Sequence, residues 1–484
     1  MKNFVKFLVI VFSVAITASL VSVSSLAAEL IDPNTLQPGS NKVIFIKDAP
    51  KDANNQIIGK LEGDGTGFDA ENPLQPIAPE NFIHDDRCTE WYFQTAFYQA
   101  TELLKDDGGT IVICGPVYLG VNDSNASDGS VIDIFTAKYG ENTIKITSVY
   151  NGVDYREKAG AKIVLESPVG IGMEGRSIWE NIDIATASAS CVISFNNFAT
   201  LVGEGVNCYP TDEAIKGIES NYVSLTAGHR YLGGVDLTTN LVVKSGTYNV
   251  IAAGEWGVNN RRELKDDGTV IRTNNLEGNT NANLVIEGTT TVYGEVIGTN
   301  KEGAEFSGNS TVTINGGKFK CEFSMVGKTG LMNTDGKVTL KINGGDFSDA
   351  WAINDATAGC ANNMPAVSIL DFSGWTGELS DLANAYGVVT EFSEIKLPAG
   401  VTGGQVLVAA TTATELAETE LEVTTPIETA SAVTEAEDVE TSASETEAPV
   451  VDGGANMTIV VIAIVAVVVI AGVVVGVILA KKKK

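Results

Sequence analysis

This chain of 484 residues has few basic residues, few histidines and few cysteines. Its 32 lysines and arginines stand against 61 acidic residues, so the formal net charge is −29, and there are only two histidines. A strongly acidic exterior argues against nucleic acid as a partner and favours solubility outside the cell. The six cysteines include no Cys-x-x-Cys pair, which argues against a zinc site. Buried thiols and disulfides fit these cysteines equally well.

Charge is also missing from a long stretch near the end of the chain. Residues 457–480 are uncharged and apolar, and four lysines follow at 481–484. About 20 apolar residues cross a bilayer as a helix, and flanking lysines stay on the cytoplasmic side. We therefore expect residues 458–480 to form a transmembrane helix with a short cytoplasmic tail. A lipid-anchor signal is the alternative, but such signals normally end in the apolar run itself.

The first residues have the pattern of a secretory signal peptide. Lys2 and Lys6 precede an apolar run from Phe7, and small residues lead to Ala27, where we expect cleavage. An uncleaved membrane anchor is the alternative. Together the two ends predict a single-pass protein of the cell membrane with an extracellular ectodomain.

Basic and aromatic residues are absent from residues 409–456, a segment rich in Thr, Glu and Ala. Such a segment cannot bury enough apolar surface to offset its ordering entropy, and its like charges extend it. We predict a disordered stalk. A helix is the alternative, but the threonines and the missing apolar period count against it.

Two similar phrases, VTINGGKF at residues 312–319 and LKINGGDF at 340–347, lie 28 residues apart. Three columns recur at this interval: Ile286, Ile314, Ile342 and Leu370; Asn315, Asn343 and Asp371; and Phe319, Phe347 and Trp375. Short β-rich units of fixed period predict a parallel β-solenoid with interior apolar stacks and an asparagine ladder. A β-sandwich is the rival. The longer interval from Val243 to Ile286 predicts a loop insertion at residues 259–269.

A solenoid needs a cap on its exposed first coil. Residues 91–107 carry the apolar stripe of an amphipathic helix, which Gly108 and Gly109 then end. The stripe consists of Ala96, Phe97, Ala100, Leu103 and Leu104. We predict a capping helix, followed by a strand in TIVICGPVYLG.

The order VIFI (43–46), GDGTG…AENPL (63–74), amphipathic helix and GGTIVICGPVYLG resembles the entry to right-handed β-helix domains of the pectin-lyase-like superfamily. The phrases GRSIWENIDI (175–184), ATLVGEGVNC (199–208) and the INGGxF repeats resemble bacterial β-helix surface and adhesin-like proteins. The resemblance covers about residues 41–400. It implies an all-β right-handed parallel β-helix, with an entry segment at 28–90 and the cap helix and β-helix at 91–408. It implies no activity, because this fold hosts lyases, hydrolases and binding proteins.

Few residues in the sequence suggest a catalytic site. Glu174 and Arg176 share one face of an extended segment, with Glu180 and Asp183 nearby, but a solvated ion pair is the favoured interpretation over an acid–base site. Catalytic residues are therefore left unknown.

Metal and cofactor signals are equally weak. His84 in HDDR and His229 in AGHRY are isolated, so neither predicts a metal site. Asp64 and Asp69 in GDGTGFD lack the EF-hand spacing, so a turn is favoured over a Ca²⁺ loop. No metal or cofactor is assigned.

Three tryptophans stand out. Trp256 and Trp351 could stack on sugars if exposed, and Trp375 belongs to the expected interior column. The expected function is binding or adhesion to an extracellular glycan or a surface protein. A cell-surface polysaccharide lyase or glycoside hydrolase and a structural envelope spacer are the alternatives.

Overall fold

The computed structural model describes sixteen parts of the chain: residues 31–48, 65–75, 95–119, 132–166, 169–187, 189–212, 218, 221–228, 238–256, 261–264, 270–273, 281–306, 308–327, 329–332, 336–356 and 365–408. All of them belong to one unit of the chain, residues 1–423. The predicted signal peptide, stalk and transmembrane helix lie outside these described residues. Within them, no helix has the length and apolar character needed to cross a membrane.

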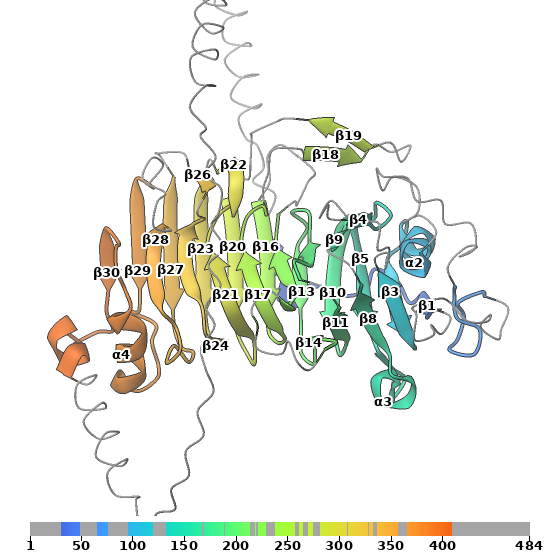
Figure 1. The fold of residues 1–484 in the computed structure, drawn as a ribbon, viewed down its shortest axis with the longest axis horizontal. Coiled ribbons are helices and arrows are strands. Elements are labelled where there is room, and N and C mark those ends of the chain that lie inside the picture. Colours follow the sequence, from blue (N-terminus) through green and yellow to red (C-terminus); the bar gives the residue numbers. More distant parts are fainter. Residues whose placement is uncertain are drawn as a thin grey trace, which may run out of the picture. The chain divides into compact units, whose positions relative to one another are not determined.

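The fold is mostly β, with long sheets of parallel strands and few helices (Figure 1). The largest sheet has eleven strands in the order β1 (Val43–Ile46), β2 (Gly109–Ile113), β5 (Gly140–Thr147), β10 (Gly175–Glu180), β13 (Thr200–Val202), β16 (Thr238–Val243), β20 (Asn281–Ile286), β23 (Asn309–Ile314), β27 (Lys337–Ile342), β29 (Val367–Asp371) and β30 (Glu394–Lys396). This order follows the chain, so each strand lies beside its counterpart from the next repeat. The arrangement is compatible with a β-helix or solenoid.

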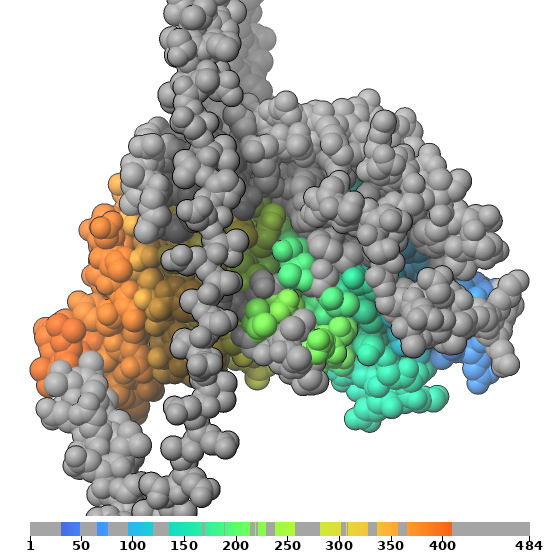
Figure 2. Space-filling view, in the orientation of Figure 1, coloured from blue at the N-terminus to red at the C-terminus, as the bar shows by residue number. Residues whose placement is uncertain are grey.

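Two further parallel sheets follow the same progression. One contains β4 (Ile132–Phe135), β9 (Val169–Gly172), β12 (Val192–Ser194), β15 (Ser224–Thr226), β17 (Thr247–Ala252), β21 (Thr291–Ile297), β25 (Glu322–Val326) and β28 (Ala352–Ala356), with β24 (Lys318–Phe319) paired to β21. The other contains β3 (Pro116–Leu119), β8 (Lys162–Leu165), β11 (Asp183–Thr186) and β14 (Asn207–Pro210). On the face shown in Figure 2, the described residues run in chain order from blue to orange.

Three small pairs of strands complete the β structure. The parallel pair is β22 (Glu302–Phe306) with β26 (Thr329–Met332), and β6 (Val149–Tyr150) pairs antiparallel with β7 (Val153–Asp154). The antiparallel pair β18 (Arg261–Leu264) and β19 (Val270–Thr273) lies at the predicted insertion. The insertion after Val243 is thus a hairpin that leaves the parallel register of Val243 with Ile286 intact.

The predicted interior columns are present. Ile286, Ile314 and Ile342 pair in register on β20, β23 and β27, and all three are fully buried. The rings of Phe319 and Phe347 are also buried and stack with centroids 4.9 Å apart. These contacts confirm the 28-residue unit as a structural repeat.

The asparagine ladder is confirmed for one pair, Asn315 and Asn343, and not for Asp371, which pairs with Lys341. The side-chain amide of Asn343 donates to the Asn315 side-chain oxygen at 2.9 Å. Repetition of the same amide at the same strand position lets each side chain satisfy the next along the stack.

The prediction for residues 370–375 was wrong by two residues. Leu370 pairs with Leu340, and Asp371 pairs with Lys341, so this repeat is 30 residues long. The fully buried aromatic residue at this end is Phe372, whereas Trp375 is half-buried and donates from its indole to the Glu378 carbonyl at 3.2 Å. The connection between β27 and β29 is two residues longer than the one between β23 and β27. Residues after it therefore lie two positions later than the 28-residue interval predicts.

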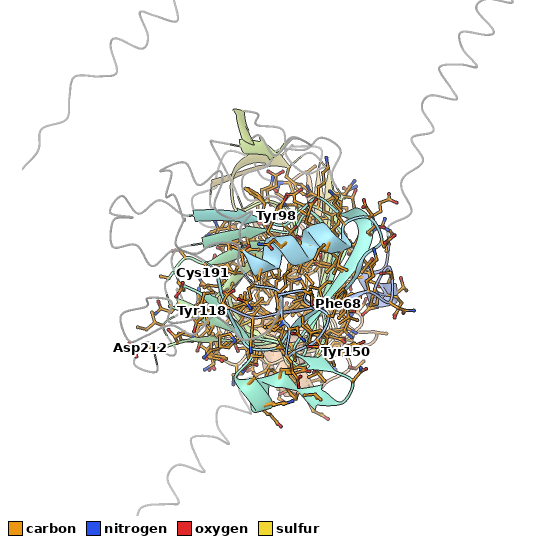
Figure 3. All side chains as sticks on the ribbon, turned by 90° about the vertical axis from the view of Figure 1, so that its right-hand side faces the viewer. Phe68, Tyr98, Tyr118, Tyr150, Cys191 and Asp212 are labelled. Carbon is orange, nitrogen blue, oxygen red and sulfur yellow. The ribbon has the colours of Figure 1, made fainter. Side chains whose placement is uncertain are left out.

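The helix α2 (Ala96–Leu104) lies across the interior side chains at the end of the stack where β1 begins (Figure 3). Thr95 caps it by accepting from the Tyr98 amide at 3.1 Å. Its buried face holds Ala96, Phe97, Ala100, Thr101 and Leu104, and it packs on β1 and β2. An amphipathic helix is thus present within the predicted residues 91–107 and packs on the first strands, except that Leu103 lies at the edge of the apolar stripe and is 51% exposed.

The opposite end of the sheets carries a second helix, α4 (Leu379–Gly387), which the sequence did not reveal. It buries Leu382, Ala383 and Ala385, and its Tyr386 ring lies 6.3 Å from that of Phe372. The helix α4 therefore buries apolar side chains next to the last strands of the stack.

The described N-terminal residues cross the outer face of the largest sheet before entering it. The short helix η1 (Pro33–Thr35) lies against β13 and β16, and the Asn240 side chain donates to the Ile31 carbonyl. The Gly39 amide then donates to the Thr143 carbonyl at 2.9 Å. The segment predicted as an entry thus contributes β1 directly to the first sheet.

The described cysteines lie in the interior. Cys114 and Cys208 are buried thiols whose pKa values burial raises to about 11 and about 12. Cys191 and Cys321 are also buried, while Cys88 and Cys360 lie outside the described residues. For Cys114 and Cys208, the buried-thiol alternative is correct.

Candidate functional site

The solvated ion pair favoured from the sequence for Glu174 and Arg176 is wrong, and the alternative acid–base site does not form either, because the two side chains have other partners. Glu174 lies before β10, is buried, and accepts a hydrogen bond from the Asn196 side chain. Burial raises the pKa of Glu174 to about 7. Arg176 lies on the outer side of β10, where it donates to the Glu141 carbonyl at 3.0 Å. The pairing of β10 with β5 shifts register between Gly175 and Arg176, and this irregularity breaks the alternation that would put both side chains on one side.

The other sequence candidates separate in the same way. Glu180 forms an ion pair with Lys145 on the neighbouring strand β5. Asp69 accepts from the Glu71 and Asn72 amides at 2.9 and 2.8 Å, so it stabilises a turn, as the favoured interpretation stated. Within the described residues, no group of three or more His, Cys, Asp or Glu side chains is placed to hold a metal ion. Asp64, His84 and His229 lie outside that part of the chain.

The tryptophans are not gathered into a site. Trp351 is 51% exposed, and Trp256 is half-buried beside a small apolar cluster of Val250, Ala252 and Ile297. The Lys301 ammonium lies 3.8 Å from the centre of the Trp256 ring. This contact already occupies one face of that ring.

A groove of about 640 Å³ brings together residues from five strands of two sheets and from the connections between strands. Its lining residues are Asp183, Asn207, Cys208, Tyr209, Tyr222, Thr247, Thr291, Tyr293, Lys318 and Lys320. A volume of this size is typical of ligand sites. Of the residues singled out from the sequence, only Asp183 lies here.

Strand alternation explains why these side chains face outward. Thr247, Thr291 and Lys318 pair in register on β17, β21 and β24. The next residue on each strand is fully buried: Tyr248, Val292 and Phe319. Because successive side chains on a strand point to opposite faces, the threonines and the lysine form an outward column.

A pair of tyrosines forms the aromatic part of the groove. The rings of Tyr222 and Tyr293 stack with centroids 5.0 Å apart and planes 6° from parallel. Tyr222 is only 8% exposed, so it supports Tyr293, which is half-buried at the groove wall. The stack fixes the orientation of the Tyr293 ring before any ligand arrives.

Tyr209 is the third aromatic residue of the wall. Its hydroxyl donates to the Asp183 carboxylate at 3.2 Å. Burial and the neighbouring Asp183 charge raise the pKa of Tyr209 to about 12, so it stays protonated near neutral pH. This hydrogen bond holds the Tyr209 ring and the Asp183 carboxylate in a fixed arrangement.

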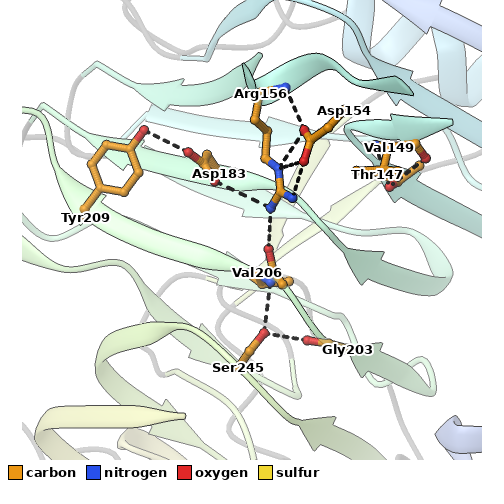
Figure 4. A network of polar contacts seen from close by, with 10 residues as sticks. Thr147, Val149, Asp154, Arg156, Asp183, Gly203, Val206, Tyr209 and Ser245 are labelled. Atoms are coloured by element: carbon orange, nitrogen blue, oxygen red, sulfur yellow. Dashed lines mark hydrogen bonds and ion pairs between the residues drawn. The ribbon is translucent and has the colours of Figure 1, made fainter. Parts of the chain in front are cut away.

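Arg156 lies between Asp183 and Asp154 and contacts both carboxylates (Figure 4). It lies in the short helix α3 (Tyr155–Ala159), and its Nη2 is 2.6 Å from an Asp154 carboxylate oxygen. Its Nη1 donates to the Gly205 carbonyl at 3.0 Å and lies 3.9 Å from Asp183. The hydrogen bond from Arg156 lowers the pKa of Asp154, whereas partial burial raises the pKa of Asp183. Arg156 therefore contacts two carboxylates, of which Asp154 has a lowered pKa and Asp183 a raised one.

The far end of the groove carries two lysines that are already paired. Lys318 lies 3.2 Å from Asp346 and 3.8 Å from Asp349, and Lys320 lies 3.0 Å from Asp349. The Lys320 ammonium is also 5.8 Å from the centre of the Tyr293 ring. Their positive charges are thus largely balanced within the protein.

Sequence reasoning missed the tyrosines and the lysines of this groove. Thr247 and Thr291 are 44 residues apart, whereas Thr291 and Lys318 are 27 apart, so no constant period marks the column. The sequence signal for these residues is strand alternation: in each strand the outward-facing residue comes directly before a buried one. Strand register is needed to bring those positions together.

Comparisons with family models, with curated proteins and with solved structures find no match to this chain. The candidate site therefore rests on its own geometry.

Proposed function

We propose that this protein is a membrane-anchored surface protein built on a right-handed parallel β-helix, and that it binds a glycan in the groove. The long parallel sheets and the resemblance to pectin-lyase-like domains support the β-helix. The apolar segments at the two ends of the sequence support the surface location. One observation carries the function: a prearranged tyrosine wall converges with carboxylate, amide and hydroxyl groups in one groove.

The chemistry of the groove suits a sugar. The C–H face of a pyranose ring is apolar and packs against an aromatic ring, as on Tyr293. Sugar hydroxyls both donate and accept, so they fit Asp183, Asn207 and the two threonines Thr247 and Thr291. Few rotamers have to be ordered on binding, since the Tyr222 stack and the Arg156 bridge already hold two of these groups.

A glycan array with the full-length chain in mild detergent tests this proposal. Saturable binding to a defined glycan is expected, and Tyr293→Ala should weaken it about tenfold, corresponding to roughly 1.4 kcal/mol of lost packing. Tyr293→Phe keeps the ring and should bind nearly as well. Phe68→Ala removes an exposed aromatic residue outside the groove lining and serves as the matched control. Equal loss in Phe68→Ala, or no glycan binding at all, would contradict the proposal.

Polysaccharide cleavage is the second candidate function. Asp183 favours it, because a carboxyl with a raised pKa on a groove wall suits a general acid. Incubation with polysaccharides should then yield new double bonds, seen by ultraviolet absorbance, or new reducing ends. Asp183→Asn should abolish either product while leaving binding within a few-fold. Product formation that survives in Asp183→Asn would remove Asp183 from any catalytic role.

A further inference from the structure

We infer that the groove takes an uncharged, linear glycan that lies along the direction in which the strands stack. This inference rests on the proposed function and specifies its ligand. It is carried by two observations: the internal pairing of every charged side chain that lines the groove, and the order of the strands that supply the lining.

Charge decides against an anionic glycan. Lys318 and Lys320 line the groove, but Asp346 and Asp349 hold their ammonium groups at 3.2 and 3.0 Å. A uronate or sulfate would have to share each ammonium group with a carboxylate that already balances its charge, so it would gain less from either lysine. It would also approach the Asp183 carboxylate, on a chain whose formal net charge is −29. Like charges placed together in an interface oppose binding.

Charge also decides against a cationic glycan. Asp183 is the one carboxylate among the groove-lining residues that the structure describes. It already accepts from the Tyr209 hydroxyl and lies 3.9 Å from Arg156. An amino sugar would have to compete with Arg156 for that carboxylate. Hydroxyl groups, in contrast, can add to these contacts without breaking them.

The strand order sets the direction of the ligand. Apart from Tyr222 and Lys320, the lining residues come from β11, β14, β17, β21 and β24. β11 pairs with β14, β21 pairs with both β17 and β24, and β14 lies against β17 without pairing. Neighbouring strands are about 4.8 Å apart, so the groove extends about 19 Å along the stack. Several pyranose rings in a row fit that length, whereas a single sugar would leave Asp183 or Lys320 without contact.

The test compares oligosaccharides of matched length by calorimetry on the full-length chain in mild detergent. The neutral probes are di- and tetrasaccharides of glucose, mannose, galactose and N-acetylglucosamine. The charged probes are a galacturonate tetrasaccharide and a glucosamine tetrasaccharide. We expect a neutral tetrasaccharide to bind at least about tenfold more tightly than its disaccharide and than both charged probes, with little dependence on salt.

One variant tests the charge argument separately. Asp349→Asn leaves the groove lining unchanged but removes the closest partner of Lys320. It should increase affinity for the galacturonate tetrasaccharide about two- to fivefold, an effect that salt suppresses, and leave neutral binding unchanged.

The outcomes separate the two proposals. Tighter, salt-sensitive binding of a charged tetrasaccharide to the unaltered protein would overturn the inference while leaving glycan binding in place. A neutral disaccharide that binds as tightly as its tetrasaccharide would overturn the extended path along the strands. Failure of every probe to bind would overturn the proposed function and this inference together.

Discussion

The buried carboxyl of Glu174 should make the stability of this protein depend on pH, and Glu174→Gln isolates that dependence. Burial raises the pKa of Glu174 from 4.5 to about 7, while the Asn196 amide donates to the carboxyl. Gln at this position keeps an oxygen that accepts from Asn196 but cannot ionise. The substitution therefore changes the charge and preserves the contact.

The sign and size of the effect follow from the two pKa values. Below about pH 4.5 the carboxyl is protonated in both the folded and the unfolded chain, so it adds no pH dependence. Between pH 4.5 and 7 the unfolded chain releases its proton first, which favours unfolding as the pH rises. At 1.36 kcal/mol for each pKa unit, the free energy of unfolding falls by about 3 kcal/mol and then levels off. Glu174→Gln should remove this loss, so that it is more stable than the natural chain at pH 8.

Urea unfolding at a series of pH values between 4.5 and 8 measures this difference, with fluorescence of the buried Trp179 as one reporter. Glu141→Gln is the control, because the Glu141 side chain is 89% exposed and its replacement should change stability by less than about 0.5 kcal/mol. Parallel stability profiles for the natural chain and Glu174→Gln would refute the reasoning. So would a Glu174→Gln variant that is less stable than the natural chain at pH 8.

Three other predictions concern the core and the Arg156 bridge. Phe347→Asp should lower the free energy of unfolding in urea by more than about 4 kcal/mol, because it puts a charge in an apolar stack. Phe347→Leu should lower it far less. Equal decreases for the two variants would contradict the stack. Arg156→Ala should raise the pKa of Asp154 toward its ordinary value, as measured by NMR titration of the carboxyl groups. It should also lower the free energy of unfolding by about 1 to 3 kcal/mol. An unchanged pKa of Asp154 would refute the bridge. In the folded protein at pH 8, Cys114 and Cys208 should react with a thiol reagent on the order of a hundredfold more slowly than after unfolding; fast reaction of both would show that they are not buried thiols.

The repeat was predictable because one structural requirement recurs at one interval. Ile314 and Ile342 must fill the same interior position in successive repeats, and their flanking Asn and Phe residues must meet their counterparts. The prediction failed at Leu370, where two additional residues in a connection change the register. Connection length is a loose constraint, since a loop can lengthen without disturbing the strands.

The helix α2 was predictable in the same partial way, because its apolar pattern is local whereas its burial depends on distant residues. Its apolar stripe is visible in the sequence, and four of the five predicted residues are buried. The edge residue Leu103 is exposed because the width of the buried face depends on what packs against it. The helix α4 was missed, since its nine residues bury only Leu382, Ala383 and Ala385.

By itself, the sequence determined the β-rich repeat, its parallel interior columns, the cap helix and the place of the hairpin insertion. Only the tertiary structure decided the groove, because Asp183, Tyr209, Tyr293 and Lys320 come from different strands separated by unequal connections. It also decided that Glu174 turns inward while Arg176 turns outward. Interior positions repeat because close packing demands the same residue type at the same place in each repeat. Outward positions meet no such demand, so the side chains that could bind a ligand become neighbours only once the strands are in register.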